Sequence, residues 1–277
     1  MKLIGVGDSV LDAYLNQKKL YPGGNSVNVA VLARRFGACE AAYIGILGDD
    51  APGRHFRAAM IQEGVDVSRV RIVHGQTAYN KIWIDETGDR HFVGGSGADT
   101  AQRMTALSLN ENDFVMIAQY DLAHTSVHSF LGVQLAAIAR RAPLSMDFSD
   151  GYTSRNMAQI CPLLRFAFFS GGDKTTGQVE ALARYALDCG AQTVVVTRGE
   201  RGSYVLEQGG AHTQPIVSAC VTDALGAGDA YIAAFLVSYD ETKGDIAESA
   251  RRASAFAAKC CEYHGAFGKP FDAADML

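Results

Sequence analysis

DALGAGD, at residues 223–229, follows an apolar run at 216–221 and precedes a helix-like run at 230–237. This order predicts a glycine-rich turn that enters the N-terminus of a helix. The free backbone N–H groups of a helix N-terminus carry partial positive charge, so the turn offers a site for a phosphate. Gly226 and Gly228 would let the backbone approach that anion closely and adopt φ values that other residues avoid.

Asp229 closes this motif and lies beside the predicted anion site. A carboxylate gains nothing from lying beside a bound phosphate. It is useful there if it takes the proton of a hydroxyl group that attacks the phosphate. The alternative is that Asp229 is a helix N-cap, which is a common use of aspartate. The heptapeptide alone leaves both interpretations open.

Polar residues also surround the start of a predicted helix near the N-terminus, in the stretch GGNSVNVA at residues 23–30. Gly24 lets the backbone pass close to a small ligand, and the amide groups of Asn25 and Asn28 suit sugar hydroxyls. The alternative is a helix N-cap formed by Asn25 or Ser26.

Two carboxylates follow the first predicted strand, Leu3–Val6. Asp8 and Asp12 lie past the end of this strand, where α/β proteins place ligand-binding groups. Taken alone, they are equally consistent with solvated turn carboxylates. Gly5 and Gly7 are not followed by a GxGxxG pattern, which makes a dinucleotide-dependent oxidoreductase a poor interpretation.

The rest of the chain alternates strand and helix patterns. We expect strands at 41–47, 114–118, 144–148, 167–170 and 193–197, and helices at 52–63, 127–140, 179–189, 230–237 and 245–263. Such alternation implies βαβ units and a parallel sheet with helices on both faces.

The pattern of residues 65–97 differs from this alternation, because strand formers such as Tyr79 and Trp83 occur there without an intervening helix. We expect these strands to pair antiparallel, with a hairpin turn at Glu86–Asp89, as a small β appendage beside the core. Tyr79 and Trp83 are interpreted as packing residues of that appendage, with a dimer contact as the alternative.

The composition is that of an ordinary globular protein, with 48% hydrophobic and 20% charged residues in 277. A net charge of -5 argues against a nucleic-acid partner. No apolar run reaches the ~20 residues of a membrane span, and the N-terminus lacks the layout of a signal peptide. The six cysteines form no CxxC pair, so we expect free thiols and a cytoplasmic location.

The two glycine motifs together resemble those of the ribokinase or PfkB family of carbohydrate and adenosine kinases. DALGAGD is similar to the family's D-T-x-G-A-G-D, with Ala224 in place of the usual Thr, and residues 23–28 are similar to its G-G-x-x-x-N. The resemblance implies one α/β domain at 1–277, with a ribokinase-like three-layer α/β/α core and a mostly parallel sheet. It also implies a small antiparallel β lid from about 10–20 and 70–97, which would exclude water as a competing phosphoryl acceptor.

The resemblance also implies roles for the motif residues. Asp229 would be the catalytic base, and the backbone of Gly226, Ala227 and Gly228 would form the anion hole. The implied substrate-binding residues are Asp12, Gly24, Asn25 and Asn28, and we add Asp8 as a further candidate.

The stretch TRGERGS at 197–203 resembles the family's T-x-G-x-x-G nucleotide loop. The implied ATP-binding residues are Thr197, Gly199, Gly202, Gly226 and Gly228, with His264 beside the adenine. A plain β-hairpin turn at 197–203 and a helix-end histidine at 264 are the alternatives.

Two family patterns are incomplete in this chain. Ser170–Asp173 stands where many relatives carry N-x-x-E, a motif that supports magnesium through water, and only Asp147 remains of D-x-N-x-R. We expect ATP and Mg²⁺ as cofactors, with the ion held largely by the nucleotide phosphates and by no protein ligand. Asp173 is a candidate replacement for the missing glutamate, or a plain loop carboxylate.

Within the family, GGNSVNVAV, DFSD and AAKCCEYHGA resemble members that phosphorylate fructosamines. This implies ATP-dependent phosphorylation of the 6-hydroxyl of fructoselysine or a related fructosamine. Candidates to hold its cationic amino groups are Asp8, Asp12, Asp85 and Asp89. A simple hexose or pentose as substrate, and a non-catalytic sugar-sensing relative, are the alternatives. The exposed edge of the lid predicts a homodimer formed through the lid strands.

Overall fold

The computed structural model describes residues 1–84, 90–274 and 276, and its centre is a large, mostly parallel sheet. The strands run in the order β14-β13-β12-β11-β10-β9-β1-β4-β5, and β6 also pairs with β4. The parallel members are β1 (Lys2–Gly7), β4 (Glu40–Gly48), β5 (Val65–Asp66), β6 (Arg71–Val73), β9 (Leu122–Ser126), β10 (Leu144–Asp147), β11 (Leu164–Ser170) and β12 (Thr193–Thr197). The antiparallel members are β13 (Ser203–Glu207) and β14 (Gly210–Gln214).

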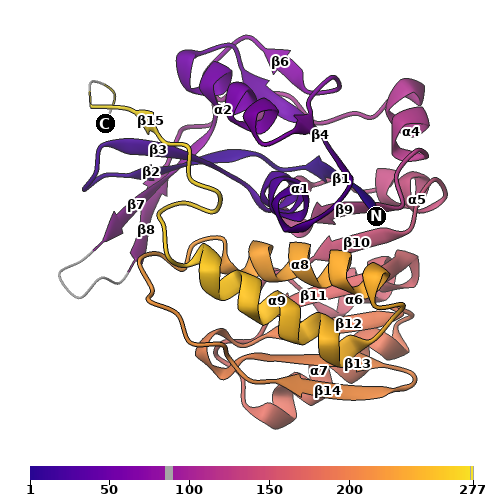
Figure 1. Cartoon of the computed structure of the whole chain (residues 1–277). Helices are drawn as coiled ribbons and strands as arrows, with labels where there is room; N and C mark the ends of the chain where they lie inside the picture. The colour runs from indigo at the N-terminus through magenta and orange to yellow at the C-terminus, as the bar shows by residue number, and fades with distance from the viewer. Residues whose placement is uncertain (85–89, 275, 277) are drawn as a thin grey trace.

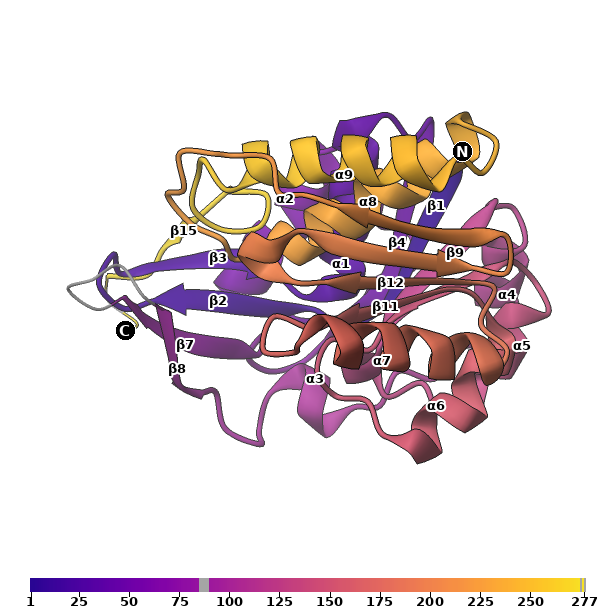
Figure 2. The ribbon, with the colours of Figure 1, turned by 90° about the horizontal axis from the view of Figure 1, so that it is seen from below.

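Helices cover both faces of this sheet (Figures 1 and 2). One face carries α1 (Asn25–Phe36), α2 (Ala51–Gln62), α8 (Ala227–Glu241) and α9 (Ile246–Cys260). The other face carries α4 (Glu111–Ile117), α5 (Gln134–Ala139), α6 (Ser154–Ile160) and α7 (Thr176–Asp188). The short elements are α3 (Ala101–Met104) and the 3₁₀ turns η1 (Val127–Ser129), η2 (Cys161–Leu163) and η3 (Gly199–Arg201). The predicted α/β/α architecture is confirmed.

The central strands are apolar along their whole length because both of their faces are covered. In β1, Leu3 packs in the core beneath α1 and α8, whereas the next residue, Ile4, packs in the core of the opposite layer. Both side chains are completely buried.

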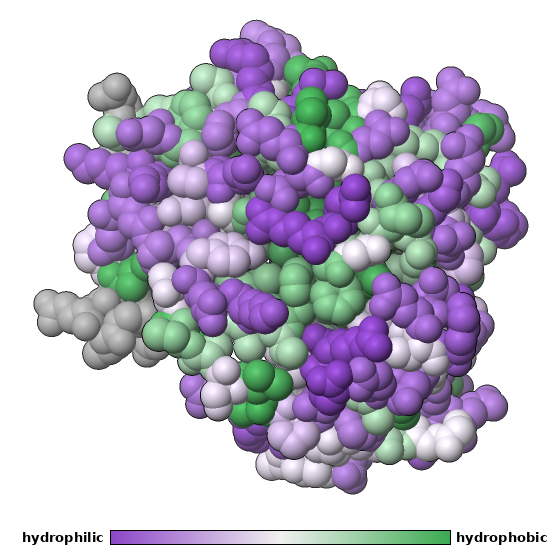
Figure 3. All heavy atoms as spheres, in the orientation of Figure 1, coloured by the Kyte–Doolittle hydropathy of each residue, from purple (hydrophilic) through white to green (hydrophobic). Residues whose placement is uncertain are grey.

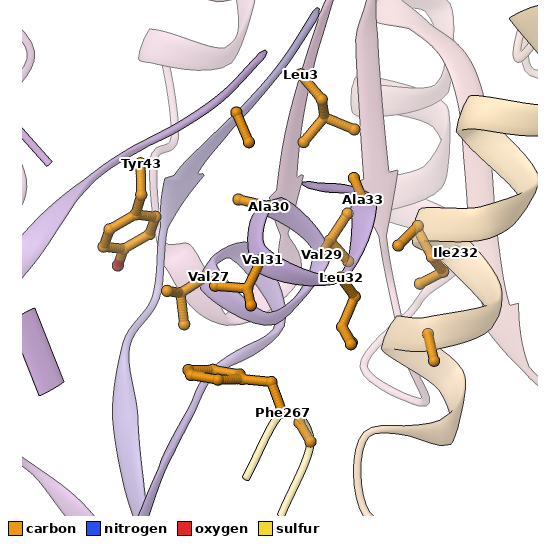
Figure 4. Close-up of a cluster of buried hydrophobic side chains, with 14 of the residues drawn as sticks. Leu3, Val27, Val29, Ala30, Val31, Leu32, Ala33, Tyr43, Ile232 and Phe267 are labelled. Carbon is orange, nitrogen blue, oxygen red and sulfur yellow. The ribbon is translucent and has the colours of Figure 1, made fainter. Parts of the chain in front are cut away.

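Helix α1 is the centre of the first core (Figure 4). Its residues from Val27 to Ala33 are buried on every side of the helix. In Figure 4, Leu3, Tyr43, Ile232 and Phe267 surround it from two strands, from α8 and from the C-terminal segment. Apart from Asn28, this stretch is apolar on all sides, as expected of a helix buried in the core.

A second, five-stranded sheet extends to one side of the core, in the order β15-β3-β2-β7-β8 (Figure 1). Its strands are β2 (Val10–Tyr14), β3 (Lys19–Gly23), β7 (Tyr79–Ile84), β8 (Arg90–Gly95) and β15 (Phe271–Asp272). The pair β2–β7 is parallel, and the other pairs are antiparallel. The hairpin turn expected at Glu86–Asp89 lies outside the described residues.

The antiparallel prediction for 65–97 is therefore wrong for part of that segment. β5 and β6 extend the central sheet parallel to β4, so this sheet includes residues 71–73 of the expected lid. β7 pairs parallel with β2 because α1 and α2 lie between these two strands along the chain. A helical crossover of that length permits parallel pairing.

Two further predictions fail between residues 110 and 140. The strand expected at 114–118 is helix α4, which a capping box between Asn110 and Asp113 starts. The helix expected at 127–140 is divided into η1 and α5, because Phe130 and Gly132 adopt positive φ values of 50° and 52°. Residues with such φ values interrupt a right-handed helix.

Hydrophilic residues predominate on the face of the molecule seen in Figure 3, and apolar residues gather near its middle. Within residues 1–84, 90–274 and 276, no helix has both the length and the apolar character to cross a membrane.

Candidate active site

A cavity of about 660 Å³ opens where the two sheets meet the N-terminal ends of α1 and α8. Its walls come from the end of β1, from β2 and β7, from α3 and from η1. The site lies at the carboxyl ends of the parallel strands, where α/β proteins bind ligands. Seven of the predicted site residues line it together: Asp8, Asp12, Gly24, Asn25, Asn28, Gly226 and Asp229.

Asp229 lies in the first turn of α8, and two amides from α1 hold its carboxylate. The side-chain nitrogens of Asn25 and Asn28 each donate to one carboxylate oxygen at 2.7 Å. Burial of the carboxylate raises the pKa of Asp229 to about 6, although the hydrogen bonds from Asn28 and Asn25 act in the opposite direction. The group is therefore ionised at neutral pH and close to the value that suits a general base.

The N-cap interpretation of Asp229 is wrong. The N-cap of α8 is Gly226, and no side chain caps the helix at that position. Asp229 is the third residue of the helix, and its carboxylate bonds to residues about two hundred positions earlier in the chain.

The two motif glycines differ in their backbone. Gly226 has a φ of 80°, and a Cβ atom on it would lie 2.4 Å from the Cβ of Ala266. Gly228 has an ordinary helical backbone, and a Cβ there would meet nothing within 4 Å. The expectation of an unusual φ therefore holds for Gly226 alone. Gly228 leaves open space at the helix start.

The start of α8 has the properties of an anion site. The backbone N–H groups of Gly228 and Asp229 donate to no atom of the residues that the structure describes, while Ala227 N–H reaches Ala224 O at 3.2 Å. Such N–H groups and the helix dipole favour a phosphate.

Asn28 has a second polar atom that faces no protein group. Its side chain is 4% exposed, and its Oδ1 atom has no hydrogen-bond partner within the described ranges. A buried acceptor without a partner costs stability, and a hydroxyl group of a ligand in the cavity would satisfy it.

Asp8 carries much of the local hydrogen bonding. One of its carboxylate oxygens accepts bonds from Ser26, Ser126 and Ser129, and the other accepts the N–H of Asn25 at 2.7 Å. Asp8 therefore caps α1 from a neighbouring segment, in place of the predicted N-cap by Asn25 or Ser26. The N-cap residue itself is Gly24, at a φ of 103°.

Asp12 is 6% exposed and lies in the middle of β2. It lies against Gly23, where a Cβ atom would come within 2.3 Å of the Asp12 carboxylate. Its carboxylate is thus held at the cavity wall, where the sequence predicted a substrate contact.

Comparison with known proteins identifies the family. Residues 1–271 match the model of the pfkB family carbohydrate kinases. This chain belongs to the PfkB family. It is 41% identical over 268 residues to fructosamine kinase FrlD of Bacillus subtilis, covering 97% of this chain and 93% of that protein. It is 33% identical over 267 residues to fructoselysine 6-kinase of Escherichia coli, covering 96% of this chain and 99% of that one.

Solved structures share the PfkB fold. The Arabidopsis thaliana ribokinase in complex with ribose and ATP superposes with a TM-score of 0.81 at 19% identity, over 99% of this chain and 96% of that one. The Salmonella enterica aminoimidazole riboside kinase gives 0.74 at 20% identity, over 98% and 97% of the two chains.

The other predicted nucleotide residues of this PfkB chain lie outside the cavity wall. Thr197 ends β12, and Gly202 and Gly199 form a tight turn before β13, in which Gly202 N–H donates to Gly199 O at 3.0 Å. His264 packs edge-on against the Tyr14 ring, with its Nδ1 atom 3.8 Å from the Asp223 carboxylate. The ATP contacts of these residues stay predictions.

The magnesium expectation also stays a prediction. In the described part of the chain, no group of three or more His, Cys, Asp or Glu residues is arranged to hold a metal ion. Asp173 is largely exposed and pairs with Lys174 at 3.0 Å. The carboxylates of the site fit an ion that arrives with the nucleotide, because Mg²⁺ keeps several waters and binds phosphates.

Sequence reasoning missed three groups of this site. Asp223 accepts bonds from Tyr14 OH and from the N–H groups of Leu225 and Gly265, and so ties β2 to the glycine turn. Asp147 accepts a bond from Asn25 at 3.0 Å, and burial, with the nearby charge of Asp229, raises its pKa to about 7.

The third missed group is His124, which lies buried within β9. A signal was present for each of the three. Asp223 opens the quoted motif, Asp147 was noted as a remnant of another, and His124 is a lone polar residue inside an apolar strand.

Proposed function

We propose that this protein is an ATP-dependent fructosamine kinase, which phosphorylates the 6-hydroxyl of fructoselysine or a related fructosamine. The observation that carries the proposal is the Asp229 carboxylate, held by two amides beside the unpaired N–H groups of α8 in a cavity of sugar size. The fructosamine kinase and fructoselysine 6-kinase names of the relatives support the substrate class.

In this proposal the 6-hydroxyl lies against Asp229, and the γ-phosphate of ATP lies at the N-terminus of α8. The hydroxyl oxygen attacks the γ-phosphorus as its proton passes to Asp229, and the bond from that phosphorus to the β–γ bridging oxygen breaks to release ADP. The N–H groups of Gly228 and Asp229 then face the charge on the transferred group. Mg²⁺ bound to the nucleotide would neutralise phosphate charge.

The sugar part of the substrate fits the amide wall of the cavity. The free Oδ1 of Asn28 and the carboxylate of Asp12 are acceptors for sugar hydroxyls. Asp8 lines the cavity, and among the described residues one of its carboxylate oxygens accepts only the N–H of Asn25. We assign any contact between Asp8 and the substrate to that oxygen. The candidates Asp85 and Asp89 lie outside the described residues.

The far side of the cavity offers a partner for the amino-acid part. Arg103 on α3 lines it and is exposed, and no carboxylate pairs with its guanidinium within the described ranges. A simple hexose has no carboxylate to pair with this cation, whereas a fructosamine built on an amino acid carries one. This favours a fructosamine over a simple hexose or pentose.

The experiment is an ADP-release screen with fructosamines, hexoses, pentoses and nucleosides, with the product mapped by NMR. We expect the highest kcat/KM with a fructosamine and phosphate on the 6-oxygen. Enzyme carrying Asp229→Asn, purified identically, is the control for contaminating kinases. Faster turnover of ribose or adenosine than of any fructosamine would overturn the assignment.

A matched pair of substrates tests the role of Arg103. The Arg103→Met variant should raise KM for fructoselysine and leave KM unchanged for a fructosamine made from a simple alkylamine, which has no carboxylate. Equal changes with both substrates would remove Arg103 from the recognition of the amino acid.

A non-catalytic sugar-sensing protein is the second candidate. Such a relative has no need of a base, yet Asp229 is present and each of its carboxylate oxygens accepts a hydrogen bond from α1. A sugar-dependent rise in melting temperature without any ADP release would favour the sensor.

Two further parts of the proposal concern the whole protein. We propose that the five-stranded sheet acts as a lid over the cavity, since β2, β7 and β8 contribute to its wall. We also propose a cytoplasmic location, where ATP is plentiful and where the six cysteine thiols would stay reduced.

A further inference from the structure

A completely buried histidine connects the central sheet to the proposed catalytic base. His124 lies on β9 with 0% exposure. Its Nδ1 atom is 2.9 Å from the hydroxyl of Ser145 on β10, and its Nε2 atom is 2.9 Å from Oδ1 of Asn25 on α1. Asn25 in turn bonds to Asp229.

The proton positions along this chain follow from its partners. Burial lowers the pKa of His124 to about 3, so the ring is neutral and carries one N–H group. An amide oxygen can only accept, so Nε2 carries the hydrogen and donates it to Asn25. Nδ1 is then an acceptor, and the Ser145 hydroxyl can turn to donate to it.

Two carboxylates orient the Asn25 amide, and the bond to His124 supports that orientation. Its nitrogen faces two carboxylates, Asp229 at 2.7 Å and Asp147 at 3.0 Å, with one hydrogen for each. The reversed amide would turn its oxygen toward both carboxylates and its nitrogen toward a hydrogen on His124. A hydrogen on Nε2 of His124 therefore supports the same orientation as the two carboxylates, the one that stabilises ionised Asp229.

We propose that His124 is a positioning residue for phosphoryl transfer, which locks the Asn25 amide so that one of its hydrogens stays on the Asp229 carboxylate. Ser145 supports this role by bonding to the other ring nitrogen, which holds the ring in place. The inference rests on the proposed function, because it takes Asp229 as the base. No motif singles out either residue.

The lock has a consequence for pH dependence. A hydrogen bond to the ionised form lowers the pKa of a carboxyl group, so loss of the lock raises the pKa of Asp229 further above its usual value. The base is active when ionised, so activity falls as pH decreases through its pKa. Without the lock, this acid limb moves to higher pH.

Other groups also face Asp229 and stay unchanged in the test. They are Asn28 on α1, Asp8 between β1 and β2, Asp12 within β2, Asp147 at the end of β10, and Arg103 and His128, which line the same cavity.

The test compares wild type with His124→Leu and His124→Gln. Leucine removes the donor and keeps an apolar side chain of similar size. We expect kcat to be roughly tenfold lower, which corresponds to the loss of one hydrogen bond. The acid limb should lie about one pH unit higher, and KM for ATP should be unchanged. Glutamine can place an amide N–H near the position of Nε2, so it should restore most of kcat and the acid limb.

Thr125→Val is the matched control, because Thr125 is the next residue of the same buried strand and its hydroxyl has no partner among the described residues. It should leave kcat and the pH profile unchanged. If His124→Leu does not fold, Ser145→Ala provides the second test, since it removes the bond that holds the other ring nitrogen and should shift the acid limb in the same direction.

A readout without turnover separates this inference from the proposed function. ¹³C NMR titration of aspartate carboxylates, with the Asp229 signal assigned by its loss in Asp229→Asn, reports the pKa of Asp229 without substrate. A higher pKa in His124→Leu supports the lock even if no fructosamine is a substrate. An unchanged pKa, or a loss of kcat that glutamine does not reverse, would show that His124 only fills space.

Discussion

At the scale of single residues, Asp229 carries the chemistry. The Asp229→Asn variant cannot take the proton of the substrate hydroxyl, so kcat should fall by about 10²–10⁴-fold. The change removes a negative charge beside the phosphates, so the affinity for ATP should hold or increase slightly. Steady-state kinetics, ATP titration and a melting curve on this one variant test the expectation.

The pH profile of the wild type checks the same residue. The pKa of Asp229 is raised to about 6, so its ionised, active form is present above this pH and is lost below it. kcat/KM should therefore decrease as pH falls through about 6. A variant that binds ATP and turns over at the wild-type rate, or a flat profile from pH 5 to 8, would refute the role of Asp229.

The two motif glycines make opposite predictions. Gly226→Ala should lower the melting temperature, because φ is 80° and the new methyl group would meet Ala266 at 2.4 Å. Gly228→Ala should leave the melting temperature unchanged or slightly higher, since alanine suits a helix. Its methyl group would enter the open space at the helix start, so KM for ATP should rise.

Melting curves and ATP kinetics on both variants test this pair. The variants are controls for each other, because they differ by two positions in one motif. Equal destabilisation by both would contradict the structural distinction between the two glycines.

The sequence predicts this site where a backbone requirement or a polar side chain marks the residues of a motif. Gly226, Asn25 and Asn28 are marked in this way, and the structure brings all three to Asp229. The lock by His124 leaves no such mark, because its partners belong to separate elements that only the folded chain brings together. Likewise, the neighbours of Asp8 show that it caps α1, whereas its position after a strand does not.

At the scale of elements, a buried ion pair joins β6 to α4. The carboxylate of Asp113 is fully buried and accepts bonds from Arg69 at 2.8 Å and from Arg71. Burial alone would raise the pKa of Asp113, but the N–H of Asn110 and the two arginines outweigh it and hold that pKa below its usual range. This carboxylate fixes where α4 begins.

The Asp113→Ala variant should therefore lose about 2 kcal/mol of unfolding free energy, less than for a fully buried pair because both arginines keep contact with water. Urea denaturation measures the change. Glu111→Ala is the matched control from the same helix. Glu111 pairs with Arg141 at the surface, so the change should stay within about 0.5 kcal/mol. Equal losses from the two variants would count against the buried pair.

The elements that the sequence predicts best are those with long apolar patterns. The buried strand 193–197 is found as expected, and the helix at 230–237 is found within α8. The failures fall where local chemistry overrides periodicity, as in the capping box that turns the expected strand at 114–118 into a helix. Strand direction at β6 and β7 was missed because it depends on helices elsewhere in the chain.

At the scale of the whole molecule, the second sheet exposes large apolar side chains. Trp83 is 47% exposed, Phe92 65% and Val93 54%. β8 is an edge strand of this sheet, and an apolar edge is an aggregation hazard in a monomer. Pairing of two such sheets would cover these residues, so we predict a homodimer.

Light scattering at micromolar concentration should give twice the chain mass. Trp83→Glu should shift the protein toward monomer, because a dimer would bury two like charges together. Glu40→Ala, at an exposed site on the central sheet, should not change the mass. A wild-type monomer under these conditions would remove the idea.

The contact between α1 and α8 has a consequence for how the chain is made. Asn25 and Asn28 bond to Asp229 across 204 and 201 residues. During synthesis, α1 is therefore made long before its partner α8. Until α8 leaves the ribosome, one apolar side of α1 has no partner. A nascent chain in that state exposes hydrophobic surface, which favours aggregation. A fragment that ends at residue 214 should therefore be mostly insoluble under conditions where the full chain is soluble. The soluble fraction of each protein after expression measures the effect of the missing α8.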